Sequence, residues 1–458
     1  MTCFQIHCII LKTKNNIRKI LQGLLVLFFL TSCASRTVFN RQYISDKIKD
    51  QSGFSLPDQF SDSLIIPQGV VIDNGLTEDE AVSIALWNNP QLQVDLSVLG
   101  FARADLIEAR MLPNPVFSLL FPLGPKQLEF TLSYYADILW QRPGKVAIAE
   151  LNTENVAENF VQHGLAIVRD VCISYADLIR DREQMNFLKN KANLDEEILN
   201  IASLRLETGD ISELEETAFR LAASQARESF LNAKKNLETQ KIRFLTLLGL
   251  ISEKSDIELS PVHEQELAVA DPEKLISVAL ACRPDMRASE IEIEIAGKRL
   301  GWERSKILNL TAILDANAEG KEGFEMGPGM QLAIPIFNVN KGGRVRARTE
   351  MQKAAAKYIV IQQSIRSQVL QSYHEYLTAK TIFDLLNNEI IPAAEQAVIN
   401  GESAYLEGEI SYLEFLEFKR QNLDAHIRFI DAEANVRKSL ANLYFSMGGK
   451  LLLPRNKE

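Results

Sequence analysis

Two short turns with the same residue pattern constrain this chain more than any other feature of its sequence. The pattern Gly-acid-Ile-Ser-x-Leu begins at Gly209 and recurs at Gly408, 199 residues later. In each copy the glycine can adopt the positive φ that ends a helix, and the serine three residues on can cap the next helix. The repetition predicts the tips of two long αα-hairpins in a tandem-duplicated chain, with Ile211 and Ile410 at matching places in the tips.

A long helix is expected before each turn, because apolar residues recur there every seven positions. We expect these helices to span about 145–206, after Arg142-Pro143-Gly144, and about 345–405. Seven-residue spacing is typical of a coiled-coil seam, and about sixty helical residues span ~90 Å. Pro392 is expected to kink or relax the second helix. The seam residues are Val171, Leu178, Met185, Ala192, Leu199 and Leu206 in the first half and Val369, Tyr376, Phe383, Ile390, Ala397 and Ala404 in the second.

Two pairs of strands are predicted, at 116–123 and 128–139 in the first half and at 310–319 and 329–338 in the second. From Leu128, apolar and polar residues alternate, a pattern typical of transmembrane β-barrel strands; a hairpin packed on a soluble core is the alternative. Four strands cannot close a barrel, and lipid does not tolerate open sheet edges. Three protomers would share twelve strands, with the helices continuing below as a hollow tunnel.

Each half is predicted to contain, in order, a helix, two strands, a long helix and a second helix that runs back along the long one. The first half covers residues 77–249, and its first helix is expected to run from the capping box at Thr77 to about Arg110. A linker at 250–272 separates it from the second half, 273–449, which a tail at 450–458 follows. The predicted fold is therefore mostly α-helical, with a small transmembrane β part.

Residues 1–32 have the features of a signal peptide. A basic segment precedes the short apolar run Ile20–Leu30, and Leu30-Thr31-Ser32-Cys33 resembles a bacterial lipobox, in which the cysteine carries the lipid. An ordinary signal peptide with a chance cysteine is the alternative. Because Ala34 rather than Asp follows the cysteine, the resemblance favours the outer membrane. Residues 33–76 are polar and are expected to form an extended, lipid-anchored tether.

Several function classes are disfavoured. A net charge of −10 argues against nucleic-acid binding. The five histidines lie far apart without an HxxxH or HExxH pair, and the chain has neither a P-loop nor GxGxxG. We therefore expect no catalytic site, no metal site and no cofactor besides the lipid on Cys33. Cys172 and Cys282 would remain as thiols and fit small core positions better than a disulfide framework.

This layout, with Asn88-Asn89-Pro90, Leu112-Pro113-Asn114-Pro115, Leu332–Phe337 and the two glycine tips, resembles the TolC family of outer-membrane efflux channels, above all its lipid-anchored members. The resemblance covers nearly all of residues 77–449. It implies a homotrimeric channel-tunnel in the outer membrane of a Gram-negative bacterium, with most of the chain in the periplasm. It also implies a periplasmic adaptor and an inner-membrane transporter as partners, docking at the tips around Gly209 and Gly408, and no catalysis. The transported substrate stays open.

The same resemblance implies a periplasmic gate near the tips. Tyr405 matches the gate tyrosine, Glu414 and Glu417 match an acidic ring, and Glu215 matches an acidic partner in the other hairpin. Ile410 departs from the pattern, because the best-known member has an arginine there that bonds across the tip. A solvated acidic helix face is the alternative for the glutamates. For the whole chain, the rival hypothesis is a lipid-anchored periplasmic coiled-coil scaffold or adaptor.

Overall fold

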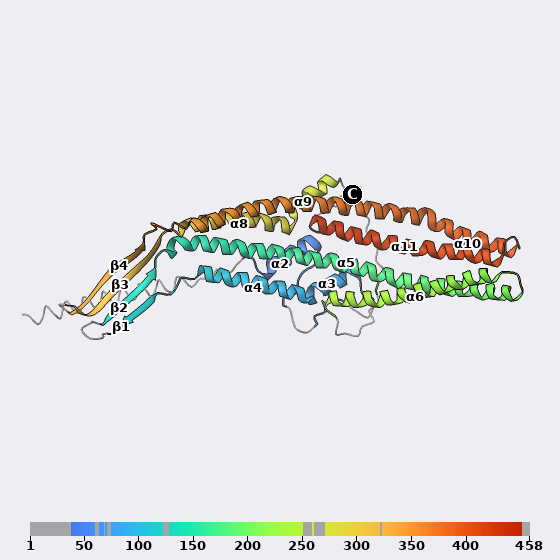
Figure 1. The fold of residues 1–458 in the computed structure, drawn as a ribbon, viewed down its shortest axis with the longest axis horizontal. Helices are drawn as coiled ribbons and strands as arrows, with labels where there is room; N and C mark the ends of the chain where they lie inside the picture. Colours follow the sequence, from blue (N-terminus) through green and yellow to red (C-terminus); the bar gives the residue numbers. More distant parts are fainter. Residues whose placement is uncertain are drawn as a thin grey trace, which may run out of the picture. The chain divides into compact units, whose positions relative to one another are not determined.

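Two long helical hairpins make up most of the structure, which is a computed structural model. It describes residues 38–59, 64–67, 69–70, 75–121, 128–250, 259–260, 271–320 and 323–450. The helices and strands belong to one unit, Arg41–Glu458, and Met1–Asn40 forms another. Within the larger unit, long helices run side by side and the strands extend from one end of them (Figure 1). Cys33 and most of the 250–272 linker lie outside the described residues.

The two halves contain the same elements in the same order. The first has α3 (Glu78–Asn88), α4 (Pro90–Arg110), β1 (Val116–Leu120), β2 (Glu129–Tyr135), α5 (Ile138–Glu207) and α6 (Glu213–Leu248). The second has α7 (Pro272–Cys282), α8 (Pro284–Ser305), β3 (Asn309–Gly320), β4 (Gly323–Ala333), α9 (Lys341–Leu385), a π-helical turn η2 (Leu386–Ile390), α10 (Ile391–Leu406) and α11 (Tyr412–Met447). The predicted fold class, mostly helical with two pairs of strands, is confirmed.

The prediction of one helix over 77–110 was wrong, because the chain breaks it into α3 and α4 at Asn89. Pro90 disfavours helical geometry in the preceding residue, and Asn89 accordingly has φ −65° and ψ 120°. The Asn89 side chain then accepts a hydrogen bond of 2.8 Å from the backbone N–H of Gln91, which caps α4. The second half breaks in the same way at Arg283, before Pro284.

Several element ends also differ from the prediction. The helix α5 begins at Ile138, so Pro143 lies inside it and β2 ends at Tyr135. At the other end of the sheet, β4 ends at Ala333 rather than near 338. Pro335 explains this shorter strand, since proline has no N–H to donate to a neighbouring strand.

The predicted relaxation of the second long helix at Pro392 is confirmed. The π-helical turn Leu386–Ile390 lies just before it, and Pro392 is the second residue of α10. In an α-helix the proline ring would clash with the carbonyl of the residue four positions earlier, and the wider turn avoids that clash.

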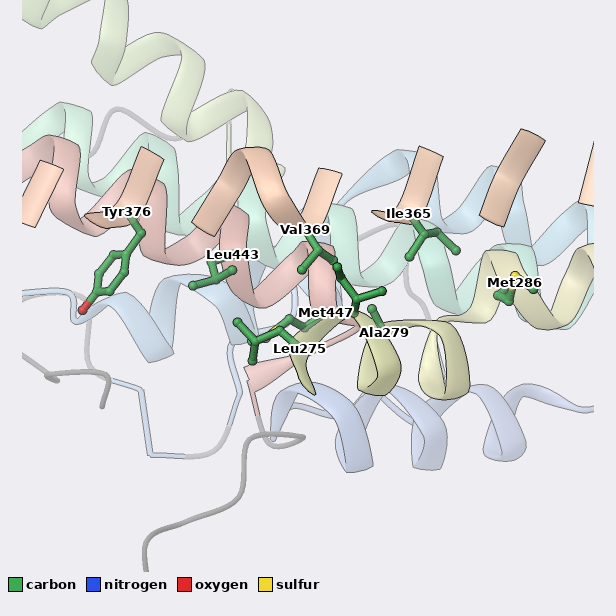
Figure 2. Close-up of a cluster of buried hydrophobic side chains, with 9 residues drawn as sticks. Leu275, Ala279, Met286, Ile365, Val369, Tyr376, Leu443 and Met447 are labelled. Carbon is green, nitrogen blue, oxygen red and sulfur yellow. The ribbon is translucent and has the colours of Figure 1, made fainter. Parts of the chain in front are cut away.

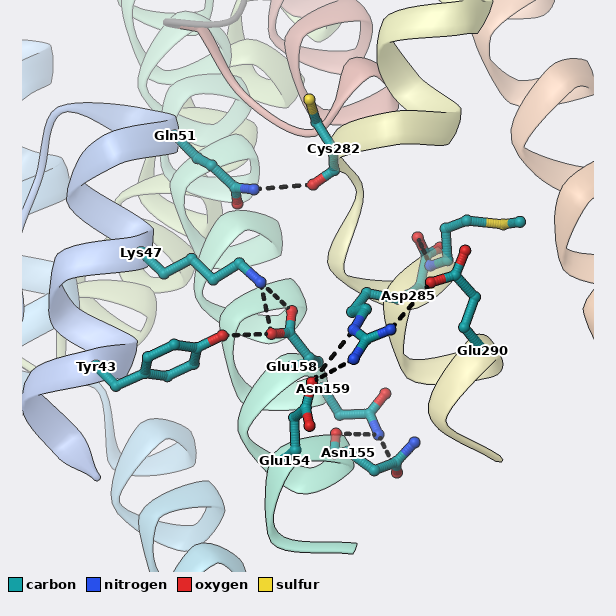
Figure 3. Close-up of polar contacts among 12 residues, drawn as sticks. Tyr43, Lys47, Gln51, Glu154, Asn155, Glu158, Asn159, Cys282, Asp285 and Glu290 are labelled. Carbon is teal, nitrogen blue, oxygen red and sulfur yellow. Dashed lines mark hydrogen bonds and ion pairs between the residues drawn. The ribbon is translucent and has the colours of Figure 1, made fainter. Parts of the chain in front are cut away.

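The N-terminal segment is not fully extended, which corrects the expectation for residues 33–76. Residues Arg41–Ser52 form a helix, α2, whose Ile44 and Ile48 are completely buried. On α5, the carboxylate of Glu158 is almost fully buried, forms an ion pair with Lys47 and accepts a 2.8 Å hydrogen bond from Tyr43 (Figure 3). Burial, and then this hydrogen bond, raise the pKa of Tyr43. The polar composition of the segment concealed this helix, because Ile44 and Ile48 are the only buried apolar residues of α2.

Gln51 extends these contacts to the second repeat. At the C-terminal end of α2, its side-chain amide donates a 3.0 Å hydrogen bond to the carbonyl oxygen of Cys282, the last residue of α7 (Figure 3). Between α8 and α5, Arg287 donates a 2.8 Å bond to Glu154. The N-terminal helix therefore contacts both repeats.

The four strands form one antiparallel sheet in the order β1–β2–β3–β4. Because β2 and β3 come from different repeats, their pairing joins the two halves of the chain. Directly opposed residues share a face of a sheet, so the row Phe117, Leu132, Leu314 and Pro328 lies on one side. The next row, Ser118, Thr131, Asp315 and Gly327, lies on the other, where Thr131 donates a 2.9 Å hydrogen bond to Asp315.

The first of these faces is apolar along all four strands. Its exposed side chains include Phe117, 62% exposed, and Met330, 78% exposed. The opposite face mixes polar residues and glycine with a few apolar residues, so the predicted alternation is confirmed. None of the described helices has an apolar stretch long enough to cross a bilayer. The apolar face consists of Phe117, Leu119, Phe130, Leu132, Tyr134, Leu310, Ala312, Leu314, Ala316, Met326, Pro328, Met330 and Leu332.

The helices follow the order of the strands. Near the sheet the contacts run α4–α5–α8–α9, and toward the tips they run α6–α5–α11–α10. Since α5 has 70 residues, it spans ~105 Å and can carry both α4 and α6 along its length. The helices α4 and α6 meet at Asn89, whose side-chain amide donates a 3.0 Å hydrogen bond to the carbonyl oxygen of Leu247 at the end of α6. In the second half, the Arg283 side chain likewise donates a hydrogen bond to the carbonyl oxygen of Ser446 in α11.

A buried apolar cluster holds the second repeat together beside this junction. Leu275, Ile276 and Ala279 of α7 pack against α9 and α11 (Figure 2). Other members are Met286, Ile365, Val369, Tyr376, Leu443 and Met447. Two of the predicted seam residues, Val369 and Tyr376, therefore lie in the core.

The junction between α6 and α3 yields a stability prediction. Gly249 has φ +76°, and a Cβ atom there would lie 2.5 Å from the carbonyl oxygen of Asn88. We expect Gly249→Ala to lower the free energy of unfolding by ~2 kcal/mol or more, because it combines a left-handed alanine with a backbone clash. Thermal denaturation of the detergent-solubilised protein measures the change.

Gly301→Ala is the matched control. Gly301 lies in α8, and a Cβ atom there meets nothing within 4 Å. Alanine at this helical position should raise stability by ~0.5–1 kcal/mol. Equal effects of the two variants would contradict the role assigned to the Gly249 junction.

Candidate functional site

The two hairpin tips have the same backbone geometry, as the repeated pattern predicts. Gly209 and Gly408 each have φ +81°, and a Cβ atom at either would meet nothing within 4 Å. The requirement for glycine therefore comes from the backbone angle, not from crowding. After Gly408, the N–H of Glu409 donates a 2.8 Å bond to the carbonyl of Ala404, which closes the end of α10.

Glu215 and Glu414, both predicted gate residues, are capping residues in this structure. The backbone N–H of Ser212 donates a 2.7 Å hydrogen bond to Glu215, and that of Ser411 donates an equal bond to Glu414. These backbone bonds, followed by those of the serine hydroxyls, lower the pKa of both carboxyl groups. The sequence signal was present as Ser-x-x-Glu after each tip, the spacing of a capping box.

Tyr405, predicted as the gate tyrosine, belongs to an aromatic cluster inside the second hairpin. Its ring stacks on Phe415 with 6.0 Å between centroids and an interplanar angle of 2°, and it lies 5.1 Å from the ring of Tyr412. It is 38% exposed. The tyrosine that reaches the other hairpin is its neighbour Tyr412, whose hydroxyl donates a 2.8 Å hydrogen bond to Glu197 on α5.

Further contacts join α5 and α11 at positions progressively farther along the helices from the Tyr412–Glu197 hydrogen bond. Lys191 forms an ion pair with Asp424, and the ring of Phe187 stacks on His426 at 5.3 Å. Farther along, Lys438 lies 3.1 Å from a carboxylate oxygen of Asp177. These residues, with Glu197 and Tyr412, hold the two hairpins of the chain together. Sequence reasoning missed them, because partners on different helices share no local pattern.

Glu414 and Glu417 border a cavity of about 240 Å³ between the two hairpins. Arg420 lines it as well and lies 2.8 Å from Glu417, while Asp195 enters from α5. Ile410 supplies no cation at the tip, so Arg420 provides the positive charge beside these acids. Glu215 does not line this cavity; its place is at the cap of α6.

Asp195 is the most deeply buried acid of this cavity, with 4% of its surface exposed. Burial raises its pKa, while the nearby charges of Arg420 and Lys191 act in the opposite direction. The folded protein therefore holds this proton more tightly than the unfolded chain does.

The tips also expose apolar side chains. Leu214 and Leu406 are 80% and 77% exposed, and they lie close in sequence to Ile211 and Ile410. Among the described residues, no group of three or more His, Cys, Asp and Glu is placed to hold a metal ion.

The raised pKa of Asp195 predicts a pH dependence. A carboxyl group whose pKa is raised by folding contributes stability at low pH that is lost as the pH rises through its folded pKa. Asp195→Asn should therefore be more stable than wild type at pH 7, and its advantage should shrink as the pH falls toward 3.8, the ordinary value. Denaturation midpoints at several pH values measure this; Asp105→Asn, at an exposed position of α4, controls for removal of one charge. A constant advantage across this range would contradict the prediction.

Known proteins resemble this chain in sequence. Residues 275–449 match the family described as outer membrane efflux protein. The cobalt-zinc-cadmium resistance protein CzcC of Cupriavidus metallidurans is 24% identical over 362 residues, which cover 78% of this chain and 86% of CzcC.

Solved structures share the fold at low sequence identity. The Campylobacter jejuni CmeC outer membrane channel has a TM-score of 0.68 at 17% identity and covers 86% of this chain and 90% of its own. The outer-membrane channel OprN has a TM-score of 0.67 at 18% identity, with 82% and 91% covered, and CusC has 0.66 at 17%, with 86% and 99% covered. The second repeat therefore matches the outer membrane efflux protein family, and the fold of the chain is similar to that of solved TolC-like outer-membrane channels.

Proposed function

We propose that this chain is the outer-membrane channel of a tripartite efflux system. It would pass substrates from an inner-membrane transporter and a periplasmic adaptor across the outer membrane. The observation that carries this function is the four-stranded sheet with a continuous apolar face at the end of two long helical hairpins. Such a face fits lipid, and the helices are long enough to reach far into the periplasm.

Three copies of the chain would complete the pore. In one protomer, β1 and β4 are the edge strands of the sheet, and each leaves backbone groups without a strand partner on its outer side. Lipid contains no water to bond these groups, so β1 of one protomer would pair with β4 of the next. Three protomers give twelve strands, an even number in the range of known barrels.

The helices support the same closure. In the order α4–α5–α8–α9, the edge helices are α4 and α9, below the edge strands β1 and β4. Both edges expose apolar side chains: Val94, Val98 and Phe101 on α4, and Val345 and Val360 on α9. Packing these edges together around a threefold axis would bury them and produce a tunnel.

The tips would form the gate and the docking surface. Gly209, Ile211, Gly408 and Ile410, with the exposed leucines beside them, are proposed to contact the adaptor. Tyr412 and its bond to Glu197 would hold the hairpins closed. Around the axis, Glu414 and Glu417 from three protomers would favour cations at the constriction.

Lipid attachment at Cys33 would hold the chain at the outer membrane of a Gram-negative bacterium. The helix α2 begins at Arg41, eight residues after this cysteine, and is firmly packed on α5. The rival, a lipid-anchored scaffold or adaptor, explains the hairpins but gives no reason for the apolar sheet face. Because CzcC is by name a cobalt-zinc-cadmium resistance protein, these divalent ions are the first substrates to test.

Conductance in planar lipid bilayers tests this function, and the wild-type protein should form pores that are mostly closed. Tyr412→Phe should increase the ratio of open to closed pores about fivefold per protomer, because it removes a bond worth ~1 kcal/mol at an exposed site. Tyr405→Phe is the matched control: it keeps the stacking on Phe415 and should change the ratio little. A protein that forms no pores would contradict the channel function, and equal effects of the two variants would contradict the gate.

A further inference from the structure

The exposed side of α4 carries a row of side chains whose character changes along the helix. Its members lie four and three positions apart, so they follow one side of the helix, and each is exposed. Apolar side chains come first, and two carboxylates follow near the sheet. The buried residues Leu99 and Leu106 lie on another side of α4. The α4 row consists of Val94, Val98, Phe101, Asp105 and Glu108.

The exposed side of α9 carries a row with the opposite charge. Next to the sheet it contains two basic residues and no acid, and its members farther from the sheet are uncharged. They also lie four and three positions apart, and each is exposed. The α9 row consists of Lys341, Val345, Arg348, Gln352, Ala355 and Ile359.

The charged members of both rows lack ion-pair partners within the described part of the chain. No ion pair formed there includes Asp105, Glu108, Lys341 or Arg348. Other charges near the same ends of these helices are paired: Arg110 lies 2.7 Å from Glu150, and Glu350 lies 2.9 Å from Arg299. The two rows therefore present two negative and two positive charges that another molecule can pair.

The rows match each other when the two helices lie side by side with their sheet ends together. The helix α4 runs toward the sheet and α9 runs away from it, so this contact is antiparallel (Figure 1). At ~1.5 Å per residue, Glu108 lies ~3 Å from the end of α4, and Lys341 is the first residue of α9. Asp105 and Arg348 lie ~8 Å and ~11 Å from these ends. The apolar part of the α4 row then faces the uncharged part of the α9 row.

The two rows of one chain cannot meet, because α5 and α8 lie between α4 and α9. A second copy of the chain supplies the matching row. A contact between two α4 edges would bring carboxylates against carboxylates, and a contact between two α9 edges would bring basic groups together. Such juxtapositions of like charge are unfavourable, whereas α4 against α9 pairs opposite charges.

We propose that Glu108 pairs with Lys341, and Asp105 with Arg348, between neighbouring copies of the chain. These ion pairs select the contact of α4 with α9 over contacts of like edges, and they set its register. The inference rests on the proposed channel of several copies and adds what decides which edges meet. Because the contact joins two different surfaces, each copy keeps an open edge until a ring closes.

The first experiment reverses the charges of the α4 row. In detergent, the complex of Asp105→Lys with Glu108→Lys should dissociate about tenfold or more faster after dilution than wild type, because attraction becomes repulsion. Adding Lys341→Glu and Arg348→Glu should restore the rate to within about threefold, because the pairs are exchanged. Light scattering measures the mass over time. Arg103→Glu, at an exposed position on another side of α4, is the control and should change the rate little.

The outcomes separate this inference from the proposed function. A stable wild-type complex that charge reversal leaves unchanged would overturn the inference alone. Reversal that weakens the complex without rescue by the exchanged pairs would overturn it as well. A wild-type protein that is monomeric would contradict the proposed channel together with the inference.

The second experiment tests which edges meet. Glu108→Cys combined with Lys341→Cys, treated with a short bismaleimide, should give covalent dimers and trimers on a denaturing gel that wild type does not give. Peptide mapping should find position 108 linked to position 341. Glu108→Cys alone is the matched control and should give few such products. A link between position 108 of two copies would show that like edges meet, and the inference would be wrong.

Discussion

The outer edges of β1 and β4 impose the constraint on which the rest of the structure depends. Each edge carries backbone N–H and C=O groups on its outer side, next to a sheet face formed by residues such as Phe117, Leu132 and Met330. An apolar face fits lipid, but unpaired backbone groups do not. Pairing β1 with β4 of another copy would satisfy both requirements, and this is the basis for the proposed unit of several chains.

The duplication explains how one chain builds such a unit. Each repeat contributes a strand pair and a helical hairpin, and the pairing of β2 with β3 joins the repeats side by side. The same neighbour order continues through the helices to the tips. The junctions at Asn89 and Arg283 join the shorter helices of each repeat where they meet.

Sequence patterns predicted the features that depend on local geometry. The glycine tips, the relaxation of the helix at Pro392 and the alternation in β2 each follow from a few adjacent residues. The prediction of a single helix over 77–110 was wrong because the apolar pattern continues past Asn89, where Pro90 disfavours helical geometry. The helix α2 escaped prediction because only Ile44 and Ile48 mark its buried face, and its contact with Glu158 joins residues more than a hundred positions apart. The bond between Tyr412 and Glu197 escaped for the same reason.

The mass of the detergent-purified protein, measured by light scattering and corrected for bound detergent, tests the central claim most directly. One chain has a mass of 51.5 kDa. A shared twelve-stranded barrel requires the mass of three chains, in a complex that survives dilution because its edge strands are hydrogen-bonded. A monomer would contradict the account, since four strands cannot line a pore, and would favour the lipid-anchored scaffold instead.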